Sequence, residues 1–480
     1  MTTKRISSIA AACIFGFAGA LSFEVHAQVT PTSAAERVVA PMSGAAPGGC
    51  CASQTTQQHW VATWATAQQF AVTGGNAGGH GASGATAPLV GIVPAPTPPP
   101  PPPPGTPQRR FPIPPTLAGL NNQTVRMIVR GSIGGSRVRI RVSNAVGGAS
   151  VTLGAAHIAL RSKDSAIVPA ADRVLTFSGK PAATIYAGQV MISDPVDLTV
   201  RPLADIAISL YFPKQTSAQT NHRFSLHSTY ISKDGDMTGQ TEIPDPASVV
   251  ESYYYLAGVD VLAPADAATI VTFGDSITDG DQSSLNTNSE WPAVLAARLQ
   301  ANKATSNIAV VNAGISGNRI LGDNGGGMVR FFHDALDLPG VKWITLLEGI
   351  NDISGGARQT GPNAFGAADL IAAYRQVIAM AHGAGVKVIG CTLTPFGGSS
   401  AYSDRGEEIR SAANNFIRTS GEFDAVVDFD AAVRDPADPK RYRAEADSPD
   451  LLHPGDAGYK LMGEAVDLGI FVPGARGRPN

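Results

Sequence analysis

The feature that most constrains this chain is an apolar run that leads directly into a small turn carrying a serine. Residues 270–273 read Ile-Val-Thr-Phe, and Gly274-Asp275-Ser276-Ile277-Thr278 follows at once. β-Branched residues in such a run predict a strand. Open α/β sheets place their chemistry at the carboxyl ends of their strands, so Ser276 is a candidate nucleophile. The alternative is a strand-end turn in which Ser276 or Asp275 only caps the next segment.

From about residue 268 onward, short apolar runs alternate with amphipathic ones. Helices are expected at Trp291–Gln300, with Pro292 in the first turn, and at Leu370–Ala381. Strands that are apolar throughout and alternate with helices indicate a buried parallel sheet. We therefore predict a three-layer α/β/α domain with a parallel five-stranded sheet over residues 264–480. Its expected strands are Ile270–Phe273, Ile308–Asn312, Trp343–Leu347, Val386–Cys391 and Ala425–Phe429.

The preceding region reads as all-β. His59–Ala65 predicts a short strand, and from Gln123 to about Leu262 strand follows strand, with glycine pairs marking turns. This spacing predicts a jelly-roll-like β-sandwich domain over residues 58–263. The Gly- and Pro-rich residues 73–115 cannot form a core. Because the strand His59–Ala65 precedes them, we interpret them as a loop inserted in this domain rather than as a linker between domains.

Three arginines alternate with apolar residues in one of these strands. Arg137, Arg139 and Arg141 are separated by Val138 and Ile140, which is the period of a half-buried strand. The arginine row is expected to form a solvated outer face. Binding of an anionic ligand is the alternative. His157, His222 and His227 lie in the same region without metal-ligand spacing, and we interpret them as structural.

The N-terminus has the pattern of a cleavable secretory signal. A basic pair precedes the apolar run Ile9–Leu21, and a small-residue cleavage site ends at Ala27. We expect a signal peptide over residues 1–27, a disordered segment over 28–57, and a secreted or periplasmic protein without stable membrane insertion. Cys50 and Cys51 are adjacent and are not expected to pair with each other, whereas Cys391 is expected to be a buried apolar residue.

Charge excludes some partners. The 480-residue chain has a net charge of −3, and charged residues make up 16% of it. Binding of nucleic acid requires a concentrated basic face, so no nucleic-acid partner is expected.

Two more motifs follow expected strand ends. Asn312-Ala313-Gly314-Ile315-Ser316-Gly317 comes after the second strand, and Glu348-Gly349-Ile350-Asn351-Asp352 after the third. A parallel sheet brings both to the same edge as Ser276. Acyl transfer needs hydrogen-bond donors there for the oxyanion of its tetrahedral intermediate, and the Gly317 N–H and the Asn351 amide are the candidates. An ordinary turn role is the alternative for each.

A histidine near the C-terminus completes the candidate chemistry. Asp450-Leu451-Leu452-His453-Pro454 precedes a helical pattern, and Pro454 is expected in the first turn of that helix. His453 would then lie in a loop. As a general base it would take the proton of the serine hydroxyl, while Asp450 orients the ring and stabilises the imidazolium. The alternative is that His453 only packs or caps.

In order along one domain, these motifs resemble the four sequence blocks of the SGNH hydrolases, also called the GDSL esterase/lipase family. The resemblance covers about residues 268–470 and implies a flavodoxin-like α/β/α fold. It implies a catalytic triad of Ser276, Asp450 and His453, and an oxyanion hole formed by the N–H groups of Ser276 and Gly317 and the side chain of Asn351. The N-terminal region, with Trp60-x-x-x-Trp64, is similar to the extra β-domain of a secreted bacterial subgroup that resembles acetyl-xylan esterases.

The sequence thus predicts a secreted serine esterase that hydrolyses small-molecule or polysaccharide esters, with short acyl groups such as acetyl on carbohydrate favoured. No metal or organic cofactor is expected, because the mechanism needs none. A lipase or lysophospholipase, or a polyester or aryl esterase, would use the same machinery. A carbohydrate-binding protein or an acyltransferase is the alternative of another class. Asp275 and Asp352 are expected to hold turns through side-chain to backbone hydrogen bonds.

Overall fold

The protein is seen here in a computed structural model that describes residues 57–70, 119–322, 325–361 and 364–472. The described residues belong to one compact unit, Thr55–Asn480. The expected signal peptide, nearly all of the segment 28–57, Cys50 and Cys51, and the inserted loop 73–115 lie outside the described residues. No helix in the part of the chain that the structure describes is long and apolar enough to cross a bilayer.

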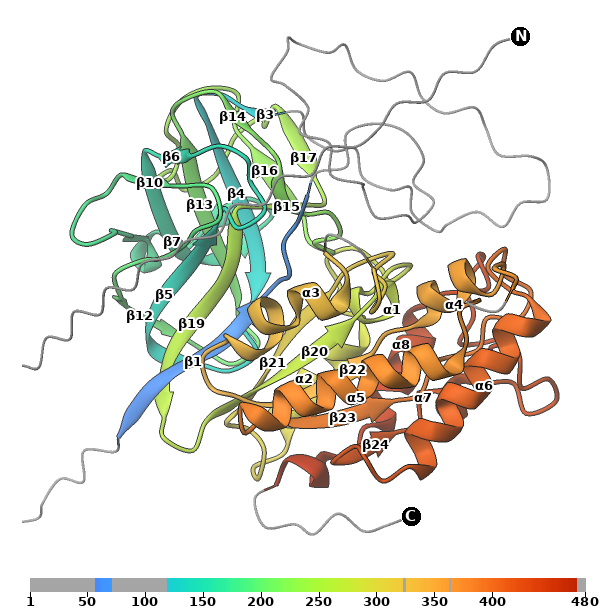
Figure 1. The fold of residues 1–480 in the computed structure, drawn as a ribbon. Coiled ribbons are helices and arrows are strands. Elements are labelled where there is room, and N and C mark those ends of the chain that lie inside the picture. Colours follow the sequence, from blue (N-terminus) through green and yellow to red (C-terminus); the bar gives the residue numbers. More distant parts are fainter. Residues whose placement is uncertain (1–56, 71–118, 323–324, 362–363, 473–480) are drawn as a thin grey trace, which may run out of the picture. The chain divides into compact units, whose positions relative to one another are not determined.

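Residues 58–264, here called the β-rich region, form two large antiparallel sheets and three small ones (Figure 1). The first large sheet contains β1 (Gln58–Ala65), β19 (Leu256–Pro264), β5 (Gly135–Ser143), β11 (Val190–Ile192) and β12 (Val196–Val200). The second contains β17 (Ser248–Val250), β16 (Thr229–Ile231), β4 (Gln123–Arg130), β13 (Asp205–Phe212), β7 (Ala155–Lys163), β8 (Ala166–Ile167) and β9 (Arg173–Val174). The small sheets are β10 (Ala183–Ile185) with β6 (Val151–Leu153), β14 (Thr216–Ser217) with β3 (Gly119–Leu120), and β18 (Tyr253–Tyr254), β15 (Thr220–His222) and β2 (Gln69–Phe70).

The core of this region lies between its two large sheets. Val125 and Met127 of β4 and Val138 and Ile140 of β5 are fully buried in one cluster. Side chains that alternate inward from two sheets make a sandwich, as the sequence predicts.

The expectation of a solvated arginine row in β5 is wrong for two of the three residues. Arg139 and Arg141 both lie against Asp260 of β19, with nitrogen–oxygen distances of 3.0 and 3.2 Å. Asp260 is fully buried. The guanidinium of Arg139 also stacks over the ring of Trp60, 4.4 Å from its centroid. A buried carboxylate requires a cationic partner, and β5 supplies two.

Residues 268–471, here called the α/β region, contain the parallel five-stranded sheet that the sequence predicts. Its strand order is β21-β20-β22-β23-β24, and every pair is parallel. The interior strand β20, which lies between β21 and β22, is buried along its whole length, which explains its uninterrupted apolar sequence. The strands are β20 (Ala268–Gly274), β21 (Ile308–Gly314), β22 (Val341–Leu347), β23 (Lys387–Cys391) and β24 (Ala425–Val427).

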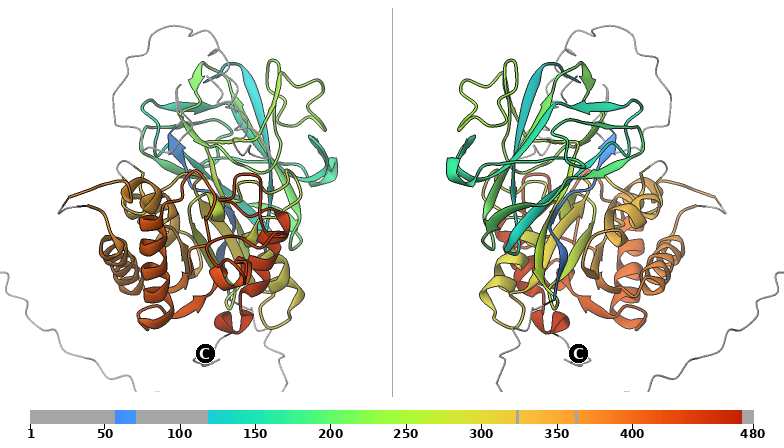
Figure 2. Two further views of the ribbon diagram at one scale, coloured as in Figure 1. Left: turned by 90° about the vertical axis from the view of Figure 1, so that its right-hand side faces the viewer. Right: turned by 90° about the vertical axis from the view of Figure 1, so that its left-hand side faces the viewer.

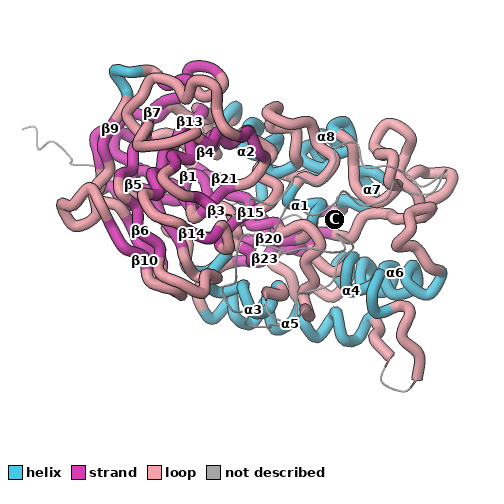
Figure 3. Tube along the Cα trace, turned by 90° about the horizontal axis from the view of Figure 1, so that it is seen from above, coloured by secondary structure: helices cyan, strands magenta, loops and turns pink. Residues whose placement is uncertain are grey.

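Helices cover both faces of this sheet. Figures 2 and 3 show α2, α7 and α8 on one side and α3, α4, α5 and α6 on the other. The helices are α1 (Ser276–Asp279), α2 (Trp291–Ala301), α3 (Gly327–Phe331), α4 (Ile350–Gly356), α5 (Ala367–Gly383), α6 (Asp404–Thr419), α7 (Phe429–Val433) and α8 (Asp456–Ala465).

Most expected boundaries differ from the structure by a few residues, and two of the differences concern capping and proline placement. The last strand ends at Val427 because Asp428 caps α7, its carboxylate accepting the Ala431 N–H at 3.0 Å. Helix α8 begins at Asp456, so Pro454 precedes the helix rather than lying in its first turn. Pro292 does lie in the first turn of α2, and Cys391 is buried, as expected.

Strand β1 belongs to the cores of both regions. Val61 packs in the β-sandwich core, whereas Ala62 packs in the core of the α/β region. The Ala62 N–H also donates to the Pro339 carbonyl at 2.9 Å. Successive residues of a strand point to opposite faces, so one short strand can join two cores. Its antiparallel pairing with β19 supports the proposal that residues 73–115 are inserted within the β-rich region.

Candidate active site

Ser276 is the first residue of α1, the short helix that follows the interior strand β20 (Figure 1). The turn requires Gly274, because a Cβ there would lie 2.3 Å from the Leu347 carbonyl oxygen. Asp275 caps α1 by accepting the Ile277 N–H at 3.0 Å. The expectation that Asp275 holds its turn is confirmed. Ser276 is thereby fixed at the carboxyl edge of the sheet, and the first N–H groups of a helix have no acceptor within it.

Ser276, His453 and Asp450 are in direct contact. Ser276 Oγ lies 2.7 Å from His453 Nε2, and His453 Nδ1 lies 2.7 Å from Asp450 Oδ2. A carboxylate can only accept, so Nδ1 carries the proton and Nε2 presents its lone pair to the serine hydroxyl. Ser276 and His453 are both buried, with exposed fractions of 4% and 6%.

Asp450 is held in its charged form. Its Oδ1 accepts the N–H groups of Leu452 and His453, each at 3.0 Å, and the Ser448 hydroxyl at 2.9 Å. Burial alone would raise the pKa of Asp450, but its hydrogen bonds with the His453 ring and the backbone, and its electrostatic interaction with that ring, hold the pKa well below its usual range. The carboxylate is therefore ready to stabilise an imidazolium at neutral pH.

A second carboxylate lies on the other side of the histidine. Asp281 Oδ2 is 3.7 Å from His453 Nε2, and Asp281 is 5% exposed. That distance is within ion-pair range of the imidazolium that forms when the serine gives up its proton. The sequence analysis did not identify Asp281, which has no motif beyond following Gly280.

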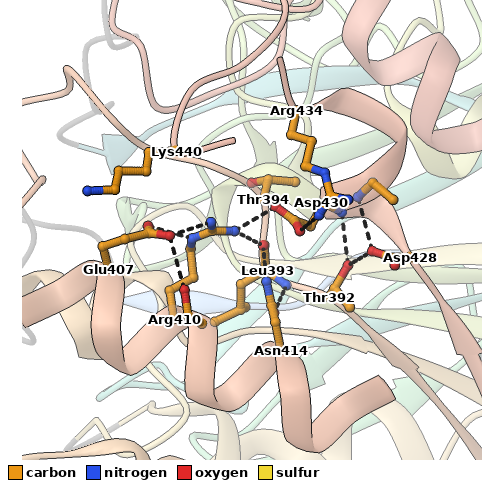
Figure 4. A network of polar contacts seen from close by, with 12 residues as sticks. Thr392, Leu393, Thr394, Glu407, Arg410, Asn414, Asp428, Asp430, Arg434 and Lys440 are labelled. Atoms are coloured by element: carbon orange, nitrogen blue, oxygen red, sulfur yellow. Dashed lines mark hydrogen bonds and ion pairs between the residues drawn. The ribbon is translucent and has the colours of Figure 1, made fainter. Parts of the chain in front are cut away.

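The loop that carries His453 is anchored to the segment that follows β23. Tyr442 Oη lies 2.7 Å from Thr394 Oγ1 and 3.1 Å from the Leu452 carbonyl. Figure 4 shows the polar network beside Thr394, in which Arg410 donates to the Leu393 carbonyl at 2.9 Å. These contacts tie the histidine loop to a buried, hydrogen-bonded segment of the α/β region.

Gly317 lies in a tight turn after β21. The Asn318 N–H donates to the Ile315 carbonyl at 3.0 Å, and Gly317, the third residue of the turn, has φ +80°. These are the features of a type II turn, which requires a positive φ at that position. The Ile315 N–H donates to the Gly274 carbonyl at 3.0 Å, which ties this turn to the end of β20. Gly317 is exposed.

Asn351 is linked to the same turn. Its Nδ2 donates to the Asn318 carbonyl at 2.9 Å. An amide nitrogen carries two hydrogens, so one remains for a substrate oxygen. Asp352 accepts the N–H groups of Ile320 and Leu321, both at 2.9 Å. Asp352 therefore holds the segment that follows the turn, and its expected role in holding backbone is confirmed.

Arg330 fastens the strand ends beneath the site. Its guanidinium donates to the carbonyls of Gly274 and Ala313 at 2.9 and 2.7 Å, and to Asn318 Oδ1 at 2.8 Å. Arg330 is 7% exposed and also pairs with Asp334.

Three carboxyl groups behind the serine have raised pKa values because they are buried. The pKa is about 7 for Asp275, about 8 for Glu348 and about 6 for Asp352. Glu348 lies 3.7 Å from Arg330, whose charge lowers its pKa only in part. Among the described residues, no cluster of His, Cys, Asp and Glu has the arrangement of a metal site.

A serine, a histidine and a carboxylate in contact at the carboxyl edge of an α/β sheet are typical of serine hydrolases. Residues 272–461 match the model of the GDSL-like lipase/acylhydrolase family. This part of the chain is therefore a GDSL-like acylhydrolase domain, the domain of a carboxylic ester hydrolase, preceded by a region of β-strands.

Solved structures similar to this chain include three esterases. The aryl esterase of M. smegmatis is 16% identical, with 42% of this chain and 96% of that chain covered and a TM-score of 0.32. The acetyl xylan esterase AlAXEase is 20% identical (41% and 96% covered, TM-score 0.32). A variant of the acetyl-xylooligosaccharide esterase Axe2 from Geobacillus is 22% identical (41% and 91% covered, TM-score 0.33). No curated protein matches the chain. At these identities, what the three esterases act on does not define the substrate of this chain.

Proposed function

We propose that this protein is an exported serine esterase in which Ser276 attacks the carbonyl carbon of a short-chain carboxylic ester. The observation that carries the proposal is the unbroken contact from Ser276 Oγ through His453 to Asp450, with both distances 2.7 Å. Nucleophile, base and orienting carboxylate are all within hydrogen-bond reach, which is the requirement for activating a hydroxyl at neutral pH.

In the proposed mechanism His453 takes the hydroxyl proton as Ser276 attacks. The oxyanion of the tetrahedral intermediate accepts hydrogen bonds from the N–H groups of Ser276 and Gly317 and from the Asn351 amide. His453 then gives the proton to the leaving alcohol, and Asp450 and Asp281 stabilise the imidazolium in between. Water, deprotonated by the same ring, releases the acid from the acyl-enzyme.

Acetyl groups on carbohydrate are the proposed substrate class. Export, suggested by the N-terminal sequence, and an added β-rich region both suit an enzyme that acts on extracellular polysaccharide. Lipase, lysophospholipase, polyester and aryl-esterase activities would use the same groups. The pure carbohydrate-binding alternative loses its sequence support, because Tyr253, Tyr254 and Tyr255 are all buried and offer no exposed aromatic row.

The test is hydrolysis of p-nitrophenyl esters from acetate to palmitate, with acetylated xylan alongside, by the wild type, Ser276→Ala and the surface control Ser306→Ala. We expect the wild type and Ser306→Ala to cleave acetate fastest and to release acetate from xylan. Ser276→Ala should lose at least about 10³-fold in kcat. Equal activity of Ser276→Ala and the wild type would refute the proposal. Addition of an alcohol acceptor distinguishes an acyltransferase, which would form a new ester in preference to free acid.

A further inference from the structure

His222, in β15 of the β-rich region, reaches into the α/β region. It is 4% exposed, and each of its ring nitrogens faces an acceptor. Nδ1 lies 2.9 Å from the Ala67 carbonyl, and Nε2 lies 3.0 Å from Asp279 Oδ1 and 3.2 Å from the Phe224 carbonyl. Carbonyl and carboxylate oxygens only accept, so both ring nitrogens carry a proton. The side chain is an imidazolium paired with a buried carboxylate.

The charge state follows from the surroundings of the ring. Burial would lower the pKa of His222, but the charge of Asp279 and the hydrogen bonds to Asp279, Ala67 and Phe224 outweigh burial and raise the pKa above its usual value. The ring also stacks on Tyr253, with the ring centroids 6.3 Å apart. The hydrogen-bond geometry and the raised pKa of His222 therefore both indicate a protonated ring.

Asp279 links His222 to the turn that carries Gly317. Asp279 ends α1 and is 3% exposed. Its Oδ2 accepts both the N–H and the hydroxyl of Ser316, at 2.8 and 2.7 Å. One carboxylate thus has one oxygen on His222 and the other on the residue immediately before Gly317.

Ser316 determines where the Gly317 N–H points. That N–H belongs to the peptide unit between Ser316 and Gly317, which is the central peptide of the turn. Types I and II differ by a flip of this unit. Fixing Ser316 at both its N–H and its hydroxyl leaves little freedom for the peptide that follows. A donor must be in place before charge develops in order to lower the barrier.

We propose that His222 is a positioning residue for ester hydrolysis, holding the oxyanion-hole turn in its productive orientation through Asp279 and Ser316. The β-rich region then contributes to the chemical step itself. The inference rests on the proposed function, since it assigns a role within the same oxyanion hole. Loss of His222 would leave Asp279 buried without a cationic partner. A carboxylate in that position gains a proton or turns toward solvent, and either change releases Ser316.

The experiment compares His222→Gln with the wild type and with His157→Gln. His157 makes a matched contact within the β-rich region, its Nδ1 lying 2.9 Å from Asp172 Oδ2. The measurements are kcat and KM for p-nitrophenyl acetate, and the affinity for a trifluoromethyl ketone, which forms a tetrahedral adduct with a nucleophilic serine. Circular dichroism gives the folded fraction of each variant.

We expect His222→Gln to lower kcat about 10- to 100-fold, with KM changed less than about twofold, because full loss of one oxyanion donor costs about 10²- to 10³-fold. Affinity for the ketone should fall by a similar factor, and His157→Gln should match the wild type in both. A folded His222→Gln variant with wild-type kcat would overturn the inference, as would a raised KM with unchanged kcat.

A second variant keeps the test decisive if His222→Gln fails to fold. Ser316→Ala changes a half-buried side chain and removes one of the two hydrogen bonds that Ser316 donates to Asp279. We expect kcat to fall about 3- to 10-fold, because one of the two hydrogen bonds that fix Ser316 is lost while the other remains. Unchanged kcat and ketone affinity in Ser316→Ala would also overturn the inference. Failure of the proposed function can be told apart from failure of this inference, because only the former would leave Ser276→Ala active.

Discussion

Replacing Gly317 by alanine tests whether the turn conformation, rather than the glycine itself, supplies the oxyanion donor. A Cβ at Gly317 would meet no atom within 4 Å, so steric collision plays no part. The effect of the substitution comes from the backbone conformation, because φ at Gly317 is +80°. A left-handed conformation costs a residue with a side chain about 1–2 kcal/mol. A type I turn, with a negative φ at the third position, avoids that cost.

The magnitude follows from this conformational preference. If the type I turn is more stable than the productive type II turn by about 1–2 kcal/mol, the productive turn is about 5 to 30 times less populated, since each 1.4 kcal/mol is about a tenfold change. In the flipped turn the Gly317 N–H points away from the oxyanion. We therefore expect kcat of Gly317→Ala to fall about 5- to 30-fold. Complete loss of the donor, about 10² to 10³, sets the upper limit.

Gly421 provides the matched control. It has φ +67°, a Cβ there would also meet no atom within 4 Å, and it lies between α6 and β24. Both alanine variants should lower the thermal midpoint by a similar small amount, whereas only Gly317→Ala should lower kcat for p-nitrophenyl acetate. Full activity of Gly317→Ala, or an equal loss in Gly421→Ala, would refute the reasoning.

Two further predictions concern carboxyl groups. Asp450→Asn should lower kcat for p-nitrophenyl acetate by about 10⁴, because an amide can donate to Nδ1 and so favours the wrong tautomer of His453, and a fall of less than tenfold would contradict the assigned role. Glu348 has its pKa raised from 4.5 to about 8 by burial, so the folded state keeps a proton that the unfolded chain releases, and stability is lost as the pH rises from about 4.5 to about 8. Urea unfolding should show the free energy of unfolding of Glu348→Gln, relative to that of the wild type, rising by up to about 4 kcal/mol from pH 5 to pH 8.5. An equal difference at both pH values would contradict this explanation.

The parallel sheet was predictable because its strands are buried on both faces. Burial removes the alternation of polar and apolar residues, and an apolar run such as Ile270–Phe273 can then be read without knowing its neighbours. The strand ends were less predictable. The run ending at Phe429 looks like strand throughout, but Asp428 caps α7 and ends β24 at Val427.

The candidate triad and the candidate oxyanion donors in the α/β region could be found from sequence, unlike Asp281, because each follows a strand or lies beside another such residue. Asp450 and His453 are three residues apart, and Ser276 follows a strand that is apolar throughout. The arginine row of β5 shows the opposite case. Alternation correctly indicates a strand with two different faces, yet it cannot show that Asp260, far along the chain, covers the polar face.

The role of His222 could not be predicted from sequence, because its partner is also distant along the chain. It lies 57 residues from Asp279, in a strand of three residues without periodicity, and the signal used to judge it was metal-ligand spacing. Nothing in the local sequence separates it from His157, which also meets an aspartate. The two histidine–aspartate pairs differ in the position of the carboxylate. Asp172 lies in the β-rich region, whereas Asp279 belongs to the helix that begins with Ser276. A buried ion pair costs desolvation free energy that a packed apolar contact would avoid, so a pair of this kind is a poor means of stabilising the fold. The His222–Asp279 pair lies between the β-rich region and the oxyanion-hole turn, and that position favours a role in orienting the turn.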